Sequence, residues 1–226
     1  MRKTSLFNPI LILLFTCLIF PGIQRAVAQD DGKVIVWDKF DTIRNTEPLF
    51  YYGVDFSHLR VSDGSKILKS HEYRRHYPNE WLDFLEKETV RFNRVGRELR
   101  KESLYYKQNE ILPVSRSMVN DFIIAGSYSF PLDTVKNALK QYALTEKDGL
   151  GLVLLPENFN KREEQARMWV VFFDIQSREV RWATEVYGKC GGAGYTAHWG
   201  SGIVDGFKNF IHKKYRVPRY PMYDNF

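Results

Sequence analysis

One segment of the chain combines the residue types of nucleophilic catalysis with a glycine-rich loop. Residues 188–199 read GKCGGAGYTAHW and contain one cysteine, one histidine and four glycines. A thiol becomes a nucleophile when a neighbouring imidazole stabilises its thiolate, and Cys190 and His198 lie eight residues apart across the loop. A third residue that would orient the imidazole is not evident. Two interpretations therefore stay open: a thiol–imidazole pair, or a loop thiol with a histidine that packs beside Trp199.

The glycines of the same segment allow a second kind of site. Backbone amides of a glycine-rich turn before a helix can bind a phosphate, but neither a GxxxxGK[ST] motif nor the spacing of a dinucleotide loop is present. We interpret the segment as a strand-to-helix connection whose glycines permit positive φ or close backbone approach. If it has a further role, we expect a contact surface made of Gly188, Cys190, Gly191, Gly192, Gly194, His198 and Trp199.

Two other sets of residues carry weaker signals. Asp55 and Asp174 stand on predicted strands, and they form an acid–base pair of the glycosidase type only if the fold brings them together. His71 and His76 are five residues apart, whereas the HExxH zinc motif needs a separation of four. We therefore expect no metal, no cofactor and no catalytic site.

The first 28 residues have the three-part layout of a secretory signal peptide. Basic residues at positions 2 and 3 precede an apolar run over 10–20, and Ala26 and Ala28 stand three and one positions before a cut after residue 28. The run is roughly half of the 20 residues that a bilayer-spanning helix needs, so we expect no transmembrane span after cleavage. Bulky residues before Cys17 disfavour lipid attachment there. We expect an exported protein, periplasmic or associated with the outer envelope.

The charge balance argues against a nucleic-acid partner. The whole chain carries a formal net charge of +6, but without residues 1–28 it keeps 30 basic and 27 acidic residues, a net charge of +3. So small an excess is not the basic footprint of a nucleic-acid-binding domain. The mature chain would also keep Cys190 as its single thiol, so that no internal disulfide can form.

Apolar periodicity predicts alternating helices and strands. Stripes at three- and four-residue spacing predict helices over 78–100, from Pro131 to a stop at 147–149, and over 199–211. Predicted strands are 34–37, 50–62, 151–156, 167–175 and 179–187. The strand over 167–175 is apolar on both faces and should be buried on both, whereas the strand over 179–187 should be half exposed, with Glu185 on its outer side.

These elements predict an α/β sandwich, with one mixed β-sheet and helices packed on at least one face. The expected organisation is a signal peptide over 1–28, an N-terminal arm over 29–49, a single α/β domain over 50–216 and a C-terminal tail over 217–226.

Residues 170–210 read VVFFDIQSREVRWATEVYGKCGGAGYTAHWGSGIVDGFKNF: a strand ending in Asp, a hairpin, a strand with Trp, a glycine-rich stretch and a Trp-bearing helix. With YYGVDFSHLRV, WLDFLEKE and GLGLVLLPENFNK upstream, this pattern resembles a family of exported bacterial envelope proteins of unassigned function, over roughly residues 50–212. More distantly, the layout is similar to the α/β modules of the penicillin-binding-protein activator lipoproteins, the curli secretion lipoprotein and the N-terminal domain of the Tol-Pal β-propeller protein. The resemblance implies a module that binds other envelope proteins and has no catalytic site.

The function we expect is that of a non-catalytic envelope protein that contacts another envelope protein or a cell-wall glycan. The alternative is a small envelope hydrolase that uses Cys190 and His198, or the strand aspartates Asp55 and Asp174.

Overall fold

The computed structural model describes residues 34–36, 40–62, 76–92, 98–117 and 122–215. The expected signal peptide, the expected tail and His71 lie outside the described residues.

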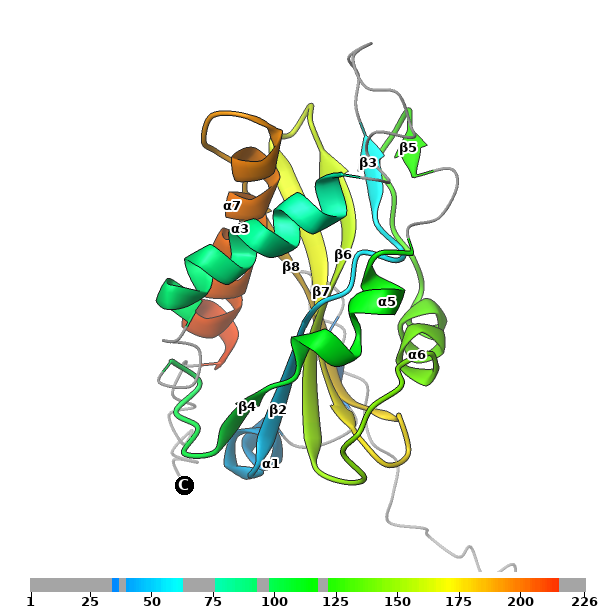
Figure 1. Ribbon diagram of the computed structural model, residues 1–226, viewed down its shortest axis with the longest axis vertical. Helices are drawn as coiled ribbons and strands as arrows, with labels where there is room; N and C mark the ends of the chain where they lie inside the picture. Colours follow the sequence, from blue (N-terminus) through cyan, green and yellow to red (C-terminus); the bar gives the residue numbers. More distant parts are fainter. Residues whose placement is uncertain (1–33, 37–39, 63–75, 93–97, 118–121, 216–226) are drawn as a thin grey trace, which may run out of the picture.

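The described strands form one mixed sheet of eight strands (Figure 1). They are β1 (Val34–Val36), β2 (Leu49–Val54), β3 (Arg60–Ser62), β4 (Leu104–Tyr106), β5 (Ile123–Ile124), β6 (Leu150–Asn160), β7 (Gln165–Asp174) and β8 (Val180–Lys189). The order is β1-β8-β7-β6-β2-β4, and β3 pairs with both β6 and β5. The pairs from β1 to β6 are antiparallel, whereas β2 and β3 run parallel to β6. The predicted mixed sheet is confirmed.

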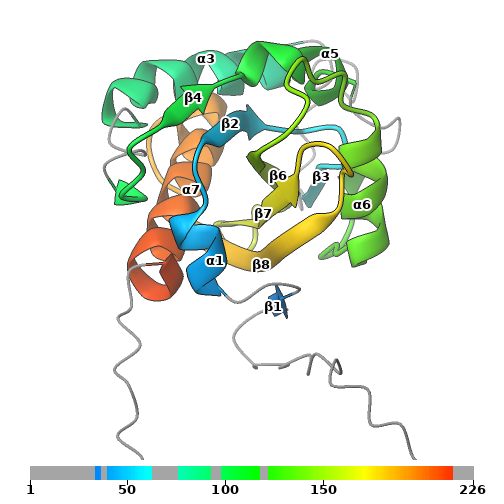
Figure 2. The same ribbon diagram turned by 90° about the horizontal axis from the view of Figure 1, so that it is seen from below.

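Helices cover both faces of this sheet. The described α-helices are α1 (Phe40–Asn45), α3 (Tyr77–Phe92), α5 (Leu112–Ser115), α6 (Leu132–Lys140) and α7 (Tyr195–Phe210), with a 3-10 turn at Gln108–Glu110 and a π turn at Ile211–Tyr215. Figure 2 shows α3 and α7 on one side of the central strands and α6 on the other. The α/β architecture expected from the sequence is therefore present, with helices on two faces.

Strand β7 is the centre of the core, as its sequence predicts. Met168, Val170 and Phe172 pack with residues of α3 and α7, while Trp169 and Phe173 pack with residues of α6 on the opposite face. All of these side chains are buried. A strand with covered faces on both sides needs apolar residues at every position, which explains the continuous apolar run.

Strand β8 corrects the prediction of a half-exposed strand. Glu185, placed on the solvent side by the alternation of the sequence, is buried, as is Ala183 on the same side. The sheet face that carries these side chains is covered: Glu185 is paired with Trp169 of β7, and Trp169 and Ala183 pack in one cluster with residues of α6. Single-strand alternation carries no information about such a distant partner.

Several predicted boundaries also differ. The segment over 50–62 is two strands, separated by a turn at residues 55–59, and the arm over 29–49 contains α1 as well as β1, which belongs to the sheet. Helix α6 ends at Lys140 rather than at 147–149, and Pro131 occupies its N-cap position instead of its first turn. The strands β6, β7 and β8 are where the sequence predicts them, with β6 extended to Asn160.

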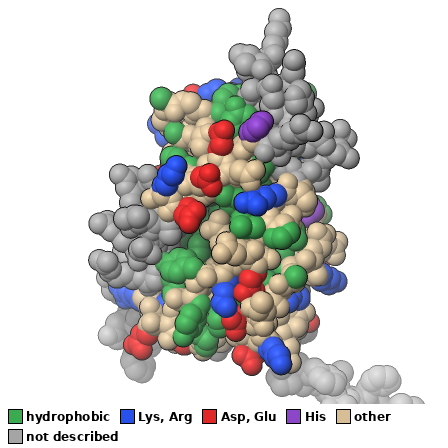
Figure 3. Space-filling model, viewed as in Figure 1, with side chains coloured by type: hydrophobic (Ala, Val, Ile, Leu, Met, Phe, Trp, Pro, Cys, Tyr) green, Lys and Arg blue, Asp and Glu red, His purple; other side chains and the backbone are tan. Residues whose placement is uncertain are grey.

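The visible surface is mixed in charge. On the face shown in Figure 3, acidic and basic side chains are interspersed rather than gathered by sign. None of the helices in the described part of the chain combines the length and the apolar character that crossing a bilayer requires.

Candidate functional site

The glycine-rich segment begins inside the sheet. Gly188 belongs to β8, and a Cβ built on it would lie 1.8 Å from the carbonyl oxygen of Gly202 and 2.3 Å from the amide nitrogen of Gly206, both in α7. Strand and helix therefore touch backbone to backbone, and only glycine fits at position 188. This contact fixes α7 against β8 and so places the start of the helix.

The loop itself uses two of its glycines for conformation. Gly192 and Gly194 have φ of +99° and +83°, in the region that other residues rarely adopt. Gly191 has no positive φ, and a Cβ there would meet no atom within 4 Å. The expected conformational role is confirmed for Gly192 and Gly194, but it does not explain Gly191.

Cys190 is a core residue. Its side chain is 4% exposed, and a Cβ on Gly202 would lie 2.5 Å from its Sγ, so the thiol packs against α7. Burial raises the pKa of this thiol to about 12; Lys161 opposes the rise, and Glu164 and Asp205 add to it. At pH 7 the thiol is therefore protonated. A thiol in this environment is a poor nucleophile.

His198 lies on the first turn of α7 and is not paired with Cys190 in the described structure. Its ring packs edge-on against Trp199 with centroids 4.8 Å apart, and no hydrogen bond joins it to Cys190 in the described structure. Burial lowers the pKa of His198 below its usual range; Lys161 lowers it further and Glu164 opposes this. The imidazole is therefore neutral at pH 7, and its buried Nε2 makes no hydrogen bond within the described residues.

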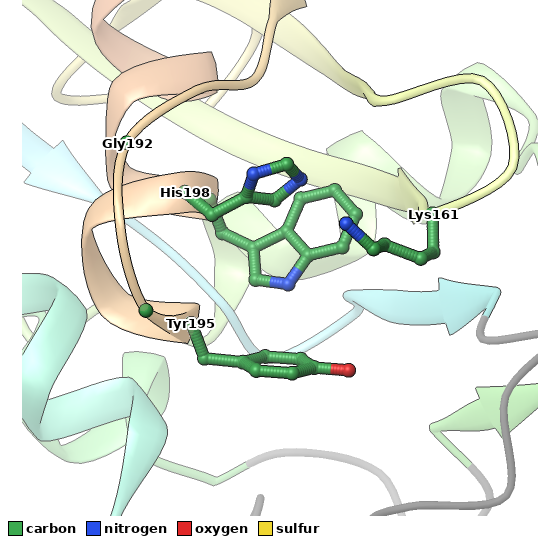
Figure 4. A pocket seen from close by; sticks show the side chains of 6 residues that line it. Lys161, Gly192, Tyr195 and His198 are labelled. Carbon is green, nitrogen blue, oxygen red and sulfur yellow. The ribbon is translucent and has the colours of Figure 1, made fainter.

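A pocket of about 180 Å³ opens at this point (Figure 4). Its walls are formed by Lys161, Gly192, Gly194, Tyr195, His198 and Trp199. Figure 4 shows the side chains of Lys161 and His198 extending toward each other above the ring of Tyr195. Lys161 comes from the turn between β6 and β7, whereas the other five come from the loop and the first turns of α7.

Aromatic rings that pack on one another, either face to face or edge to face, support the pocket. Trp199 stacks on Phe159 at 4.8 Å with an interplanar angle of 4°, and Phe159 meets the edge of Trp81 at 5.1 Å. Trp81 in turn stacks on Tyr77, which packs against Tyr195 at 5.6 Å. Rings packed in this way have little rotational freedom, so the pocket walls are preorganised.

One buried donor in this pocket has no partner. Trp199 is fully buried, and its indole Nε1 makes no hydrogen bond to any described residue. Leaving a buried N–H unsatisfied costs about 1–3 kcal/mol, so most such groups have a partner in the functional state. Because Nε1 has almost no accessible surface, it is not open to a molecule in the pocket.

The two aspartates are not brought together. Asp55, buried at the end of β2, accepts hydrogen bonds from the Tyr142 hydroxyl at 2.6 Å and from the amide of Ser57 at 2.8 Å. Asp174 accepts from the amide and hydroxyl of Ser177 and so closes the β7–β8 hairpin. These bonds give both carboxylates structural roles.

The sheet register shows how far apart the two aspartates are. The amide of Asp55 bonds to Leu154 of β6, whereas Asp174 is paired with Leu150, four residues away along the same strand. Four residues of strand correspond to about 13 Å, beyond the separation at which two carboxylates flank a single bond.

The remaining candidates give no site. In the described ranges there is no group of three or more His, Cys, Asp or Glu side chains arranged to hold a metal ion. His76 lies at the turn before α3, and His71, its proposed partner in the sequence, lies outside the described residues.

Comparison of the chain with protein-family models, with curated proteins and with solved structures found no match. Of the seven residues expected to form a contact surface, Gly192, Gly194, His198 and Trp199 line the pocket, whereas Gly188 and Cys190 pack against α7. Sequence reasoning missed Lys161 and Tyr195. Lys161 is far from the loop along the chain, and no pattern around it distinguishes it from other surface lysines.

Proposed function

We propose that this protein is an exported, non-catalytic binding or assembly module of the cell envelope, and that it contacts another envelope protein or a cell-wall component through the surface around the pocket at the start of α7. The observation that carries the proposal is the pocket itself. It brings the ammonium group of Lys161, which lies 3.8 Å from Glu164, beside the rings of Tyr195, His198 and Trp199.

The chemistry of these groups favours binding over catalysis. A hydrolase would need an activated nucleophile, and the raised pKa of Cys190 leaves its thiol protonated. The aspartates, the other candidate for hydrolysis, are held by separate hydrogen bonds at different levels of the sheet. A pocket with aromatic walls and one lysine, and without an activated nucleophile, suits recognition.

Export rests on the sequence. The basic start, the apolar run over 10–20 and the pair Ala26 and Ala28 support cleavage after residue 28 and passage into the envelope. The resemblance of residues 50–212 to exported envelope proteins, and more distantly to lipoprotein modules that bind other envelope proteins, supports the same location and a binding role.

Site-specific photo-crosslinking in the producing cells tests this function. A photoreactive amino acid at position 191 stands beside the pocket in open space, and one at exposed Lys140 on α6, across the sheet, is the matched control. We expect one defined crosslinked species from position 191 and not from position 140. We also expect Cys190→Ser to leave that species unchanged.

Two results would contradict the proposal. Equal crosslinking from both positions would mean that the pocket side is not a specific contact surface. A hydrolytic activity on envelope material that disappears in Cys190→Ser, while the melting curve stays unchanged, would replace binding with catalysis.

A further inference from the structure

We propose that Asp148 and Gly149, just before β6, form a site of spontaneous backbone modification, at which Asp148 converts to isoaspartate through a cyclic succinimide. The reactants are two neighbouring residues and water. The inference goes beyond the proposed binding function and does not depend on it.

The reaction joins the side chain of an aspartate to the backbone of the residue that follows. The amide nitrogen of the second residue attacks Cγ of the aspartate, and the amide hydrogen leaves with the carboxyl hydroxyl as water. Water then opens the ring. Attack at Cγ restores aspartate, whereas attack at the backbone carbonyl leaves the chain linked through the side chain, as isoaspartate. One water leaves and one returns, so the atoms balance without an oxidant or a reductant. Glycine favours the first step because no side chain shields its nitrogen.

The sequence alone does not single out position 148. Asp-Gly pairs occur at 31–32, 63–64, 148–149 and 205–206. The first two lie outside the described residues, so the structure compares the last two. Their local chemistry is identical, and any difference in reactivity must come from the fold.

The pair at 148–149 is free to react. Asp148 is exposed, and its carboxyl group makes no hydrogen bond or ion pair with any described residue. The amide of Gly149 likewise donates no hydrogen bond within the described ranges, although the carbonyl of the same residue accepts one from Ile175 at 3.0 Å. The carboxyl group can therefore turn toward the amide without breaking an existing interaction.

The pair at 205–206 is held on both sides. One carboxyl oxygen of Asp205 accepts hydrogen bonds from the Lys189 amide at 2.8 Å and from the side chain of Asn209 at 3.1 Å. Gly206 is buried in the interior of α7, where backbone amides donate to the preceding turn. A Cβ on Gly188 would lie 2.3 Å from the Gly206 nitrogen, so this amide is also covered by β8. Ring closure here would require local opening of α7.

The fold requires the glycine that makes Asp148 susceptible. Gly149 has a φ of +108°, and a Cβ there would lie 2.9 Å from the ring of Phe50. The modification adds one methylene to the backbone directly before this glycine. We therefore expect the packing on Phe50 and the bond from Ile175 to be disturbed, and the modified protein to melt at a lower temperature.

The modified end of the sheet is far from the pocket. Strand β6 runs from Leu150 to Asn160, which corresponds to about 33 Å, and Lys161 of the pocket follows its far end. Figure 1 shows the start of β6 and the start of α7 at opposite ends of the sheet. Crosslinking from position 191 should therefore be insensitive to the modification, and the two proposals can fail separately.

Asparagine variants make ring closure visible by mass. In Asp148→Asn the same ring closes with loss of ammonia, and hydrolysis gives aspartate or isoaspartate, so each event raises the mass of the tryptic peptide 148–161. Asp205→Asn is the matched control, because it places the same dipeptide in α7 and its tryptic peptide is 190–208. Both variants are incubated folded, at neutral pH, and in guanidinium chloride.

We expect folded Asp148→Asn to deamidate and folded Asp205→Asn to do so at least about tenfold more slowly, because α7 must open first. In guanidinium chloride the two rates should be similar. Equal rates in the folded variants would overturn the site. A difference that persists in the denatured samples would also overturn it, since the fold would then not be its cause.

The wild type shows the natural reaction. After prolonged incubation, isoaspartate should appear in peptide 148–161, as a separately eluting species of unchanged mass, and not in peptide 190–208. The aged wild type should melt at a lower temperature than fresh protein, while Asp148→Glu, whose longer side chain would have to close a larger ring, should keep its melting temperature. Absence of isoaspartate from peptide 148–161, or an equal loss of melting temperature in Asp148→Glu, would overturn the proposal.

Discussion

Replacing Gly188 by alanine tests how α7, and with it the pocket, is held in place. The added Cβ would lie 1.8 Å from the carbonyl oxygen of Gly202 and 2.3 Å from the amide nitrogen of Gly206. Both are backbone atoms, so no side chain can rotate away. To restore an ordinary contact of about 3.5 Å, α7 must move by roughly 1.5 Å or β8 must bend. Overpacking of a core typically costs about 1–3 kcal/mol, and this site belongs at or above the upper end of that range.

Gly191→Ala is the matched control for this substitution, since a Cβ at position 191 meets no atom within 4 Å and the backbone has no positive φ. Equilibrium unfolding in urea, followed by circular dichroism, gives both free energies. We expect Gly188→Ala to lose about 3 kcal/mol or more and Gly191→Ala to stay within about 0.5 kcal/mol of the wild type. A loss below about 1 kcal/mol for Gly188→Ala, or equal losses for the two variants, would refute the backbone contact.

Three further predictions follow from the core, from a buried carboxyl group and from the leader. Phe172→Ala should cost about 3–5 kcal/mol in denaturant melts, because the ring is fully buried on β7; a loss below about 1 kcal/mol would mean that the strand is not central. Burial raises the pKa of Glu157 from 4.5 to about 7, although the nearby Arg167 acts to lower it. The contribution of the protonated Glu157 to stability is therefore complete below pH 4.5 and is lost as the pH rises to 7. Between these pH values the wild type should therefore lose roughly 3 kcal/mol relative to Glu157→Gln, and parallel pH profiles of the two proteins would contradict this. N-terminal sequencing of the exported protein should begin at Gln29, and an intact Met1 or a start at Cys17 would show that the leader is misread.

The sequence was most informative where a local pattern reflects burial directly. The apolar run Met168 to Phe173 predicts a central strand because both of its faces are covered. The stripe that includes Trp199, Ile203 and Phe207 predicts α7 because its spacing matches one face of a helix. These patterns are sufficient to predict the α/β class of the fold and the order of its main helices and strands along the chain.

The burial of a residue or its place in the pocket could not be predicted from the sequence where residues far away in the chain determine it. In the sequence Glu185 looks like a solvent-facing residue, but in the fold it is buried on the sheet face where Trp169 and Ala183 pack with α6. Lys161 joins the pocket only because the β6–β7 turn lies beside the start of α7, more than 30 residues later in the chain. The reactivity of Cys190 was likewise open, since eight residues of spacing do not reveal that Gly202 makes room for its sulfur in the core.

We propose that the pocket side of α7 is a binding surface whose contact with the partner depends on Lys161. The most direct measurement is the yield of the crosslinked species from position 191 in cells that produce Lys161→Met or Lys140→Met, two variants with the same change in net charge. We expect a loss of about tenfold or more for Lys161→Met, with an unchanged melting curve, and a wild-type yield for Lys140→Met. Equal yields from the two variants would contradict it.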